Sequence, residues 1–407
     1  MKYGLIGERL GHSFSKEIHE RLGYDYELKS IPRDELKKFI CARYFLGINV
    51  TMPYKSDVIP YLDVIDGPAE EIGAVNTIVN REGKLYGYNT DFYGMRELLS
   101  HAEIDPSGKK VAILGSGGTS KTARALFKSL GADEIITVSR SGELGYDEFY
   151  KKHRDTEIIV NTTPKGMFPD IFDRPVDISG FDNLCGVIDA VYNPLETTLV
   201  RDAKGRGIKA EAGLYMLVAQ AVIASGLFLG TTYPSYTIDI VYEGLRAEKE
   251  NIVLIGMPSS GKSTVGRLLS QMTGCGFIDT DELIEAKIKM SISDFFSLHG
   301  EDEFRRVEHE VVKEIAGLTG HVIATGGGVV LNENNIYALK YNGKIVFIDR
   351  PLDDLIATED RPLSRDRASI EKLYNVRYPI YKANCDIHVN VGGSAKDVAN
   401  DILENYL

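Results

Sequence analysis

The sequence has few cysteines, no long uninterrupted hydrophobic run and no excess of basic residues. Its 4 cysteines, Cys41, Cys185, Cys275 and Cys385, are scattered among 407 residues, which is typical of reduced thiols in a cytoplasmic protein and offers no metal-ligand spacing. The longest apolar stretch, residues 213–230, is broken by polar side chains, so we expect no membrane span. The N-terminal apolar stretch is too brief for a signal peptide and predicts a first β-strand.

The balance of charge is acidic. The chain has 47 Lys and Arg residues against 59 Asp and Glu residues, and residues 1–250 and 251–407 share the net charge of -12 about evenly. We therefore expect neither half to bind nucleic acid. An acidic protein that binds anionic substrates must gather particular arginines and lysines into pockets.

Two glycine-rich segments, each between a β-branched run and a helix-like segment, indicate the organisation of the chain. Its 407 residues exceed the ~250–300 residues at which a single core stops growing, so we expect two or three domains. Strands alternate with helical segments around both glycine-rich segments, which predicts an α/β protein with mainly parallel sheets. The charged residues 246–250 predict the main boundary just before a strand at Asn251, and a second boundary is expected near residues 101–109.

The first glycine-rich segment, GSGGTS at residues 115–120, follows the strand-like residues 111–114. Its glycines allow close backbone approach to a pyrophosphate, and a helix expected to begin near Lys121 would direct its N–H groups at that group. The next strand, residues 134–138, ends in a Ser-Arg-Ser sequence where NAD-binding folds usually carry an acidic residue, and the guanidinium favours the 2′-phosphate of NADP. The predicted NADP(H)-binding residues of this Rossmann-type unit are Gly115, Gly117, Gly118, Thr119, Ser139, Arg140 and Ser141.

A series of further segments resembles, in order, the shikimate dehydrogenase family over about residues 1–245. They are residues 11–19 (GHSFSKEIH), 49–55 (NVTMPYK), 73–77 (GAVNT), 88–91 (YNTD), 159–167 (IVNTTPKGM), 189–194 (DAVYNP) and 213–220 (GLYMLVAQ). The resemblance implies reduction of 3-dehydroshikimate to shikimate by NADPH. It also implies an α/β substrate-binding catalytic domain at residues 1–100 and 221–246 and a Rossmann-type NADP domain at residues 101–220.

The residue types in these segments suit that chemistry. Hydride transfer to a ketone leaves an alkoxide that must gain a proton, which Lys55 and Asp91 can supply and support. His12 and His19 receive no role, because the lysine–aspartate pair suffices. The residues that the resemblance places at the substrate are Ser13, Ser15, Thr51, Asn76, Tyr192 and Gln220, with Gly213 at the cofactor. Lys16 stands where the family commonly has proline, and the Ser-Arg-Ser sequence stands where it commonly has Asn-Arg-Thr.

The second glycine-rich segment, GMPSSGKS at residues 256–263, matches the full G-x-x-x-x-G-K-[ST] phosphate-binding pattern and directly follows a strand. Its backbone N–H groups are expected to surround the phosphates of ATP, with Lys262 at the β- and γ-phosphates and Ser263 on Mg²⁺. The predicted ATP-binding residues are Ser260, Gly261, Lys262, Ser263 and Thr264.

The segments after this loop resemble the shikimate kinase family over about residues 251–405. They are residues 277–281 (FIDTD), 300–308 (GEDEFRRVE), 324–328 (ATGGG), 361–363 (RPL) and 377–381 (RYPIY). The resemblance implies a P-loop kinase domain with a parallel sheet at residues 251–407, which phosphorylates shikimate to shikimate 3-phosphate.

The same resemblance assigns roles in that domain. Asp279 would support Mg²⁺ together with Ser263, Asp281 would orient the nucleophilic hydroxyl, and Arg361 in a predicted lid would stabilise the transferring phosphoryl group. The residues implied to hold the substrate are Arg305, Gly326, Gly327 and Arg377.

Two alternatives remain at this stage. In the first alternative, the two sites carry out the same reactions on related substrates. Quinate remains possible as a substrate of the first site, whereas the arginine pair and the triple-glycine turn argue against gluconate as a substrate of the second. The other is a catalytically silent regulatory protein that senses shikimate or quinate, against which the presence of Lys55, Asp91, Lys262 and Asp281 argues. We expect small-molecule partners, 3-dehydroshikimate and shikimate, with no nucleic acid or membrane partner, and the sequence leaves the oligomeric state open.

Overall fold

The chain forms two compact units, Met1–Arg246 and Ala247–Leu407, in a computed structural model that describes residues 1–8, 10, 14–355 and 366–406. Both units are built from alternating helices and strands, and the α/β prediction is confirmed. In the part of the chain that the structure describes, no helix is long and apolar enough to cross a membrane.

The first lobe of unit 1 contains a six-stranded mixed sheet in the order β2-β1-β3-β5-β6-β4. Its strands are β1 (Tyr3–Gly7), β2 (Glu27–Ser30), β3 (Gly47–Val50), β4 (Val64–Ile65), β5 (Thr77–Arg81) and β6 (Lys84–Tyr88), and its helices are α1 (Ser15–Arg21), α2 (Leu36–Ala42) and α3 (Gly67–Ile72). β3, β5 and β6 pair antiparallel, and β1 pairs parallel with β2 and β3.

The second lobe contains a five-stranded parallel sheet in the order β11-β10-β9-β7-β8. Its elements are β7 (Lys110–Leu114), α5 (Gly118–Ser129), β8 (Glu134–Val138), α6 (Tyr146–Lys152), β9 (Ile158–Asn161), β10 (Gly186–Asp189), α7 (Thr198–Gly205) and β11 (Lys209–Glu211). Alternate residues of β7 belong to different core clusters, Val111 and Ile113 to one and Ala112 and Leu114 to the other, because helices cover both faces of the sheet.

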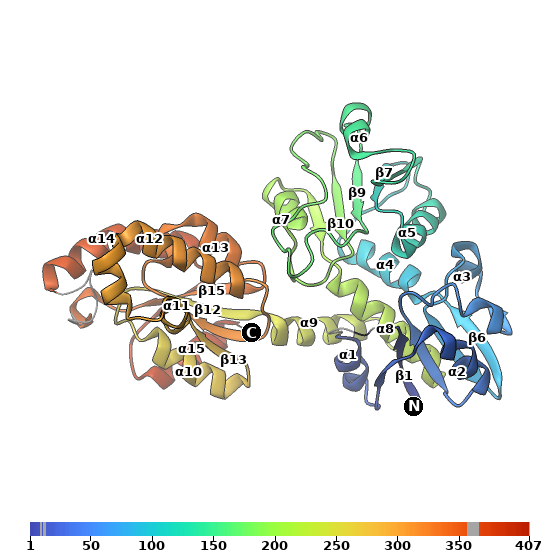
Figure 1. The fold of residues 1–407 in the computed structure, drawn as a ribbon, viewed down its shortest axis with the longest axis horizontal. Helices are drawn as coiled ribbons and strands as arrows, with labels where there is room; N and C mark the ends of the chain where they lie inside the picture. Colours follow the sequence, from blue (N-terminus) through green and yellow to red (C-terminus); the bar gives the residue numbers. More distant parts are fainter. Residues whose placement is uncertain (9, 11–13, 356–365, 407) are drawn as a thin grey trace. The chain divides into compact units, whose positions relative to one another are not determined.

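Helices α4 (Thr90–His101) and α8 (Leu214–Leu229) lie between the two lobes, and α9 (Thr237–Lys249) follows them (Figure 1). The apolar stretch at residues 213–230 is the buried helix α8, which explains its hydrophobicity on all sides. α4 and α8 approach closely at Gly94, where a Cβ would lie 2.8 Å from Met216 O and 2.9 Å from Gln220 Cβ. Glycine at this position therefore sets the spacing of the two helices.

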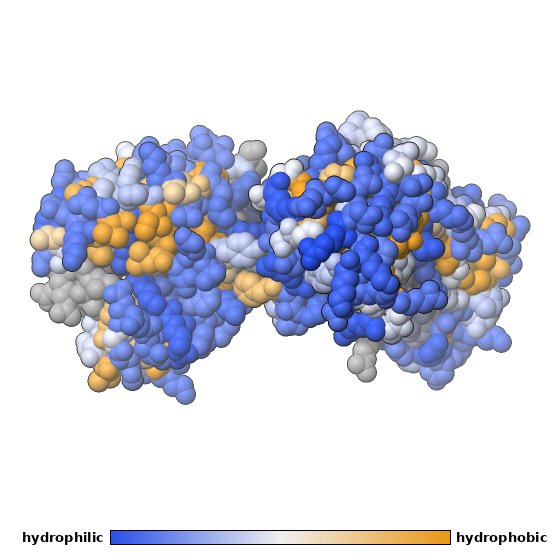
Figure 2. Space-filling model, turned by 90° about the horizontal axis from the view of Figure 1, so that it is seen from above, coloured by the Kyte–Doolittle hydropathy of each residue, from blue (hydrophilic) through white to orange (hydrophobic). Residues whose placement is uncertain are grey.

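Unit 2 contains a five-stranded parallel sheet in the order β13-β14-β12-β15-β16. Its elements are β12 (Asn251–Ile255), α10 (Lys262–Thr273), β13 (Gly276–Asp279), α11 (Thr280–Ile288), α12 (Ile292–Ile315, kinked at Gly300), β14 (His321–Ala324), α13 (Glu333–Leu339), β15 (Gly343–Asp349), α14 (Arg367–Asn384), β16 (Ile387–Asn390) and α15 (Ala395–Tyr406). Figure 1 shows α10 and α15 on one side of the sheet and α12, α13 and α14 on the other. On the surface that Figure 2 shows, hydrophilic side chains predominate and hydrophobic ones gather in a few patches.

Candidate active sites

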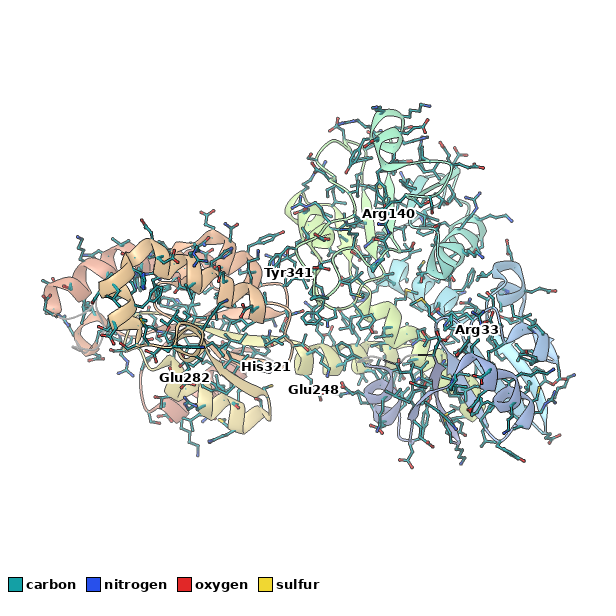
Figure 3. All side chains as sticks on the ribbon, viewed as in Figure 1. Arg33, Arg140, Glu248, Glu282, His321 and Tyr341 are labelled. Atoms are coloured by element: carbon teal, nitrogen blue, oxygen red, sulfur yellow. The ribbon has the colours of Figure 1, made fainter. Side chains whose placement is uncertain are left out.

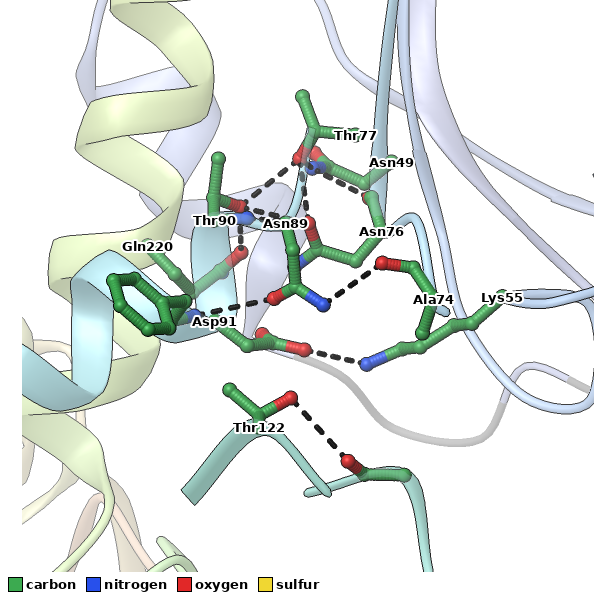
Figure 4. A network of polar contacts seen from close by, with 12 residues as sticks. Asn49, Lys55, Ala74, Asn76, Thr77, Asn89, Thr90, Asp91, Thr122 and Gln220 are labelled. Atoms are coloured by element: carbon green, nitrogen blue, oxygen red, sulfur yellow. Dashed lines mark hydrogen bonds and ion pairs between the residues drawn. The ribbon is translucent and has the colours of Figure 1, made fainter. Parts of the chain in front are cut away.

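Lys55 and Asp91 form an ion pair in unit 1, with Lys55 Nζ 2.6 Å from Asp91 Oδ2 (Figure 4). Lys55 lies in the loop after β3, and its carbonyl accepts a hydrogen bond from Val75 N at 2.8 Å. Asp91 lies in the first turn of α4, where the helix dipole favours a carboxylate. The side chain of Lys55 is 26% exposed and that of Asp91 is 17% exposed, so both can contact a ligand bound at this surface.

Buried amide and hydroxyl groups lie beside this pair (Figure 4). Asn76 Oδ1 accepts hydrogen bonds from Thr90 N at 2.7 Å and from Thr77 Oγ1 at 3.1 Å. The hydroxyl of Thr90 lies 3.4 Å from Gln220 Oε1, which connects α4 with α8. The structure thus brings Asn76 and Gln220, two predicted substrate ligands, into one network of neutral groups suited to a polyhydroxy ligand.

The other predicted substrate residues lie on neighbouring segments. Thr51 O accepts a hydrogen bond from Tyr54 N at 3.0 Å in the turn that leads to Lys55. Ser15 is the buried first residue of α1, and the ring of Tyr192, from the second lobe, lies 5.4 Å from the ring of Phe14 just before it. Ser13 lies outside the described residues.

Asn49 is a buried residue of this network to which sequence reasoning assigned no role. It accepts a hydrogen bond from Tyr26 Oη at 2.6 Å and donates one from Nδ2 to Thr77 Oγ1 at 2.9 Å. The sequence signal was its place at the start of the NVTMPYK segment. Asn49 connects the polar network to an aromatic cluster around His19.

His19 is fully buried, and its ring stacks on that of Tyr26 at 4.0 Å while Nδ1 forms a hydrogen bond with the hydroxyl of Tyr24. Burial lowers the pKa of His19 from 6.5 to about 3. The absence of a catalytic assignment for His19 is consistent with a packed, neutral imidazole.

We expect unit 1 to lose stability as the pH falls below 6.5. The folded pKa of His19 is about 3, so the unfolded chain takes up the proton first and the free energy of unfolding falls between pH 6.5 and pH 3. Protonation of His19 in the unfolded chain lowers the free energy of unfolding by about 2 kcal/mol between pH 7 and pH 5. Thermal unfolding of the full chain at both pH values, with the unit 1 transition assigned by loss of its activity, should show a smaller pH effect in His19→Phe. His101→Phe, at an exposed histidine of the same unit, should keep the wild-type pH effect, and an unchanged pH effect in H19F would refute this account.

The glycine turn after β7 has the geometry of a dinucleotide site. Gly115 has φ +108°, and a Cβ there would lie 2.7 Å from Thr162 Oγ1. α5 begins at Gly118, earlier than the predicted Lys121, because the extended backbone of Gly117 leads directly into the helix. Apart from the adjoining residues and the backbone of α5 itself, no described atom lies within 4 Å of a Cβ at Gly117 or Gly118, so the N-terminus of α5 is open to a pyrophosphate. Thr119 follows in its first turn.

The end of β8 fits the adenosine end of NADP. Ser139 Oγ is buried, and none of the residues that the structure describes forms a hydrogen bond with it. The side chains of Arg140 and Ser141 are exposed, and Figure 3 labels Arg140 in this lobe. An unpaired hydroxyl beside an exposed guanidinium suits the 2′-phosphate. Gly213 precedes α8, and a Cβ there would lie 2.4 Å from Ala190 O, so only glycine fits beside the end of β10.

The phosphate loop of unit 2 joins β12 to α10. Gly256 and Gly261 have φ +148° and +96°, which allows the loop to fold around the amino group of Lys262. Lys262 Nζ donates to Gly256 O at 2.9 Å and to Met257 O at 2.8 Å. Ser260 is buried, while Ser263 and Thr264 at the start of α10 are exposed. A positive charge held inside a ring of backbone groups fits the phosphates of a nucleotide.

The Mg²⁺ prediction concerns Ser263 and Asp279, and Ser263 Oγ donates a hydrogen bond to Asp279 Oδ2 at 2.6 Å. Within residues 1–8, 10, 14–355 and 366–406, no group of three or more His, Cys, Asp or Glu side chains could hold a metal ion. Two oxygens beside a phosphate loop nevertheless fit Mg²⁺, which usually takes one or two protein ligands and completes its shell with phosphate and water.

The acceptor side of unit 2 lies around Asp281 and the triple-glycine turn. Asp279 caps α11 by accepting from Asp281 N at 3.0 Å. A Cβ at Gly326 would lie 2.7 Å from Asp281 Oδ1, and one at Gly327 would lie 2.9 Å from Pro258 Cδ. The turn therefore packs between Asp281 and the phosphate loop, which requires the absence of side chains.

Two arginines meet at this turn. Arg377 is 3% exposed, and its Nη1 donates to Gly327 O at 3.0 Å. Arg305 Nη1 contacts both oxygens of Glu308, at 3.0 and 2.9 Å. Burial raises the pKa of Glu308, and Arg305 opposes that shift. Burial also lowers the pKa of Arg377, so a bound carboxylate would be favoured there. Glu308, the last residue of the GEDEFRRVE segment, was not assigned from sequence, and Arg361 lies outside the described residues.

Comparison with known proteins supports both halves of this description. The family model of the shikimate dehydrogenase substrate binding domain matches residues 5–78, and that of shikimate kinase matches residues 258–406. A shikimate dehydrogenase (NADP(+)) of Clostridium perfringens is 37% identical over 265 residues, covering 60% of this chain and 98% of the relative. One from Halothermothrix orenii is 38% identical over 262 residues, covering 56% and 90%.

Solved structures agree with this relationship. A chorismate mutase/shikimate 5-dehydrogenase fusion protein from Clostridium acetobutylicum has a TM-score of 0.57 and 35% identity, covering 60% of this chain and 96% of that one. Shikimate 5-dehydrogenase from Thermus thermophilus, solved in complex with NADP(H) and shikimate, has a TM-score of 0.53 and 28% identity, covering 60% and 98%. The chain therefore belongs to the shikimate dehydrogenase family through its first unit, and it is a fusion of that dehydrogenase with a shikimate kinase domain.

Proposed function

We propose that this chain is a bifunctional enzyme of the shikimate pathway: it reduces 3-dehydroshikimate to shikimate with NADPH and phosphorylates shikimate to shikimate 3-phosphate with ATP. The observation that carries the proposal is the presence of two separately built sites, one around the Lys55–Asp91 pair and one around Lys262 and the Ser263–Asp279 contact. The comparisons give no support to a catalytically silent regulatory protein.

In the dehydrogenase, bound NADPH supplies the hydride that reduces the ketone carbon. Lys55 donates a proton to the ketone oxygen, and Asp91, 2.6 Å from Lys55 Nζ, holds the ammonium in place. Asn76 and Gln220, with Ser13, Ser15, Thr51 and Tyr192, bind the ring hydroxyls and the carboxylate. We propose the domain bounds expected from sequence, a substrate-binding catalytic domain at residues 1–100 and 221–246 and an NADP domain at residues 101–220. Helix α8 (Leu214–Leu229) runs across the bound at residue 220.

In the kinase domain, residues 251–407, bound MgATP supplies the phosphoryl group. The phosphate loop and Lys262 bind its phosphates, while Ser263 and Asp279 hold Mg²⁺. Arg305 and Arg377 bind the substrate carboxylate as planar cations, and Glu308 fixes Arg305. Asp281 accepts the proton of the attacking hydroxyl, and Arg361 neutralises charge on the transferring group. We also propose a cytoplasmic location, which cell fractionation can test.

Separate assays of the two half-reactions test the proposal. Purified full-length protein with 3-dehydroshikimate and NADPH should oxidise NADPH without ATP or metal. With shikimate and ATP it should form ADP and shikimate 3-phosphate only when Mg²⁺ is present. A folded protein that shows neither reaction would contradict the proposal, and quinate with NADP(+) tests the remaining alternative substrate.

We expect Arg140→Ala to lower kcat/KM for NADPH about 10- to 100-fold, because a charge-assisted hydrogen bond to the 2′-phosphate contributes about 1.5–3 kcal/mol. The value for NADH, which lacks that phosphate, should change less than about twofold. Arg154→Ala is the matched control, since Arg154 is an exposed arginine of the same lobe whose Nε donates to Tyr150 O at 2.9 Å. Equal losses with both cofactors in R140A would exclude a role in recognising the 2′-phosphate.

A further inference from the structure

Asp189, the last residue of β10, is a fully buried carboxylate for which the mechanism above has no use. Its Oδ1 accepts hydrogen bonds from Asn161 Nδ2 at 2.9 Å and Val191 N at 3.0 Å, and its Oδ2 accepts one from Thr197 Oγ1 at 2.7 Å. Burial raises the pKa of Asp189 to about 7, and these three hydrogen bonds from uncharged groups oppose the shift. Burying a carboxylate is costly, so three converging donors indicate a specific structural task.

One of these donors shapes the loop after β9. Asn161 Oδ1 accepts from Thr163 N at 3.0 Å, and its Nδ2 also donates to Lys165 O at 3.2 Å. Thr162 Oγ1 donates to Leu114 O at 2.6 Å, and Leu114 immediately precedes Gly115 of the cofactor turn. Asp189 therefore fixes, through Asn161, the loop of residues 162–168 against the cofactor turn.

The other two donors belong to the loop of residues 190–197. In that loop, Val191 O accepts from Gly213 N at 2.8 Å, where α8 begins, and Asn193 O accepts from Phe168 N at 3.0 Å. α8 carries Gln220, and Tyr192 of the same loop contacts Phe14 near Ser15. The Asp189 carboxylate is thus a common acceptor for two loops that join the cofactor turn to the substrate side.

The topology assigns these loops to one end of the cofactor. The glycine turn directly follows β7 and Arg140 follows β8. In the strand order β11-β10-β9-β7-β8 these two strands are neighbours, and β9 and β10 lie on the other side of β7. A dinucleotide crosses the carboxyl ends of such a sheet, so with its 2′-phosphate at β8 its nicotinamide end lies over β9 and β10. Residues 162–168 and 190–197 follow those two strands.

We propose that Asp189 is a positioning residue for hydride transfer, whose buried carboxylate fixes the loops of residues 162–168 and 190–197 around the nicotinamide end of NADPH. The proposal rests on the proposed dehydrogenase function. Asparagine is nearly isosteric with aspartate but carries no negative charge. Its Nδ2 cannot accept from Thr197 Oγ1, so that hydroxyl must turn to become the acceptor, and the second Nδ2 hydrogen needs a further acceptor in a buried site.

Binding and kinetics of Asp189→Asn test this assignment. We expect the Kd for NADPH, measured by fluorescence, to rise at least about tenfold, and kcat/KM for NADPH to fall about 10²-fold. The Kd for 2′-phospho-ADP-ribose, which lacks the nicotinamide, should rise much less than the Kd for NADPH, because the loop of residues 162–168 adjoins the turn after β7 but not the 2′-phosphate site after β8. Wild-type kcat/KM for NADPH should rise with pH through about 7, as Asp189 ionises, and D189N should lack this rise.

Adjacent threonines provide a matched second test if D189N does not fold. Thr197→Val removes the hydroxyl bound to Asp189, and Thr197→Ser keeps it, whereas Thr198→Val removes a buried hydroxyl that donates to Ile171 O at 3.1 Å. T197V should weaken NADPH binding, T197S should restore it, and T198V should resemble the wild type. The thermal unfolding transition of unit 1 reports whether each variant is folded, since kinase activity belongs to the other compact unit. The assignment is overturned if D189N keeps wild-type NADPH affinity, or if NADPH and 2′-phospho-ADP-ribose weaken equally. A wild-type protein that does not oxidise NADPH would instead refute the dehydrogenase function itself.

Discussion

Lys262→Ala lowers the kcat/KM of shikimate phosphorylation by about 10³-fold and leaves NADPH-dependent reduction unchanged, if the phosphate loop acts as proposed. Lys262 is 8% exposed, and its amino group donates to Gly256 O and Met257 O, so the substitution removes a charge from the centre of the loop. Alanine supplies neither that charge nor a donor for the two carbonyls. Coupled detection of ADP and of NADPH oxidation in the same preparation measures both activities.

The matched control is Lys287→Ala. Lys287 forms ion pairs with Glu310 and Glu314, at 3.2 and 2.6 Å, in the same unit but outside the proposed site. It should keep both activities within about twofold, since partly exposed ion pairs contribute little. A K262A protein that retained a tenth or more of its kinase activity would show that phosphoryl transfer does not depend on this lysine.

The second large effect is expected at the dehydrogenase site. Lys55→Ala should lower kcat for reduction by about 10²- to 10⁴-fold, the range found for a positioned proton donor, with a smaller change in KM. The substitution also leaves Asp91 without the ammonium that lies 2.6 Å from it. Phosphorylation of added shikimate should be unaffected, because Lys55 belongs to the other compact unit.

Lys109→Ala serves as the control for Lys55. Lys109 Nζ lies 2.8 Å from Glu157 Oε1, and the two side chains are 38% and 27% exposed, so the pair resembles Lys55–Asp91 in geometry but lies away from the polar network. Equal loss of reduction in K109A and K55A would indicate a general effect of breaking an ion pair, and would remove the case for Lys55 as the proton donor.

Local sequence patterns were sufficient for the fold class and for the placement of both glycine-rich turns. Residues 134–138, predicted as a strand, form β8, since β-branched residues between turn signals indicate a strand. The start of α5 was misplaced because Gly117 and Gly118 carry no side chain that could mark a helix cap. The proposed Lys55–Asp91 pair joins residues far apart in sequence, and only the family resemblance connected them beforehand.

Buried polar contacts between distant segments could not be read from sequence. Asn49 contacts Tyr26 and Thr77, and Asp189 contacts Asn161 and Thr197, through hydrogen bonds that depend on how strands and loops pack. The sequence does not distinguish a buried polar residue within an apolar run from an exposed one. The roles of Asn49 and Asp189 were therefore assigned from the structure. Ser13 and Arg361, both outside the described residues, remain predictions from the family resemblance.

The two proposed reactions are linked chemically, because the hydroxy acid released by the first is the phosphoryl acceptor of the second. The most direct measurement is a single incubation of purified full-length protein with 3-dehydroshikimate, NADPH, ATP and Mg²⁺, followed by mass spectrometry and by NADPH absorbance. The account predicts shikimate 3-phosphate, with one NADPH oxidised and one ADP formed for each molecule of product. Consumption of NADPH without any phosphorylated product, or no consumption of either cofactor by folded protein, would contradict it.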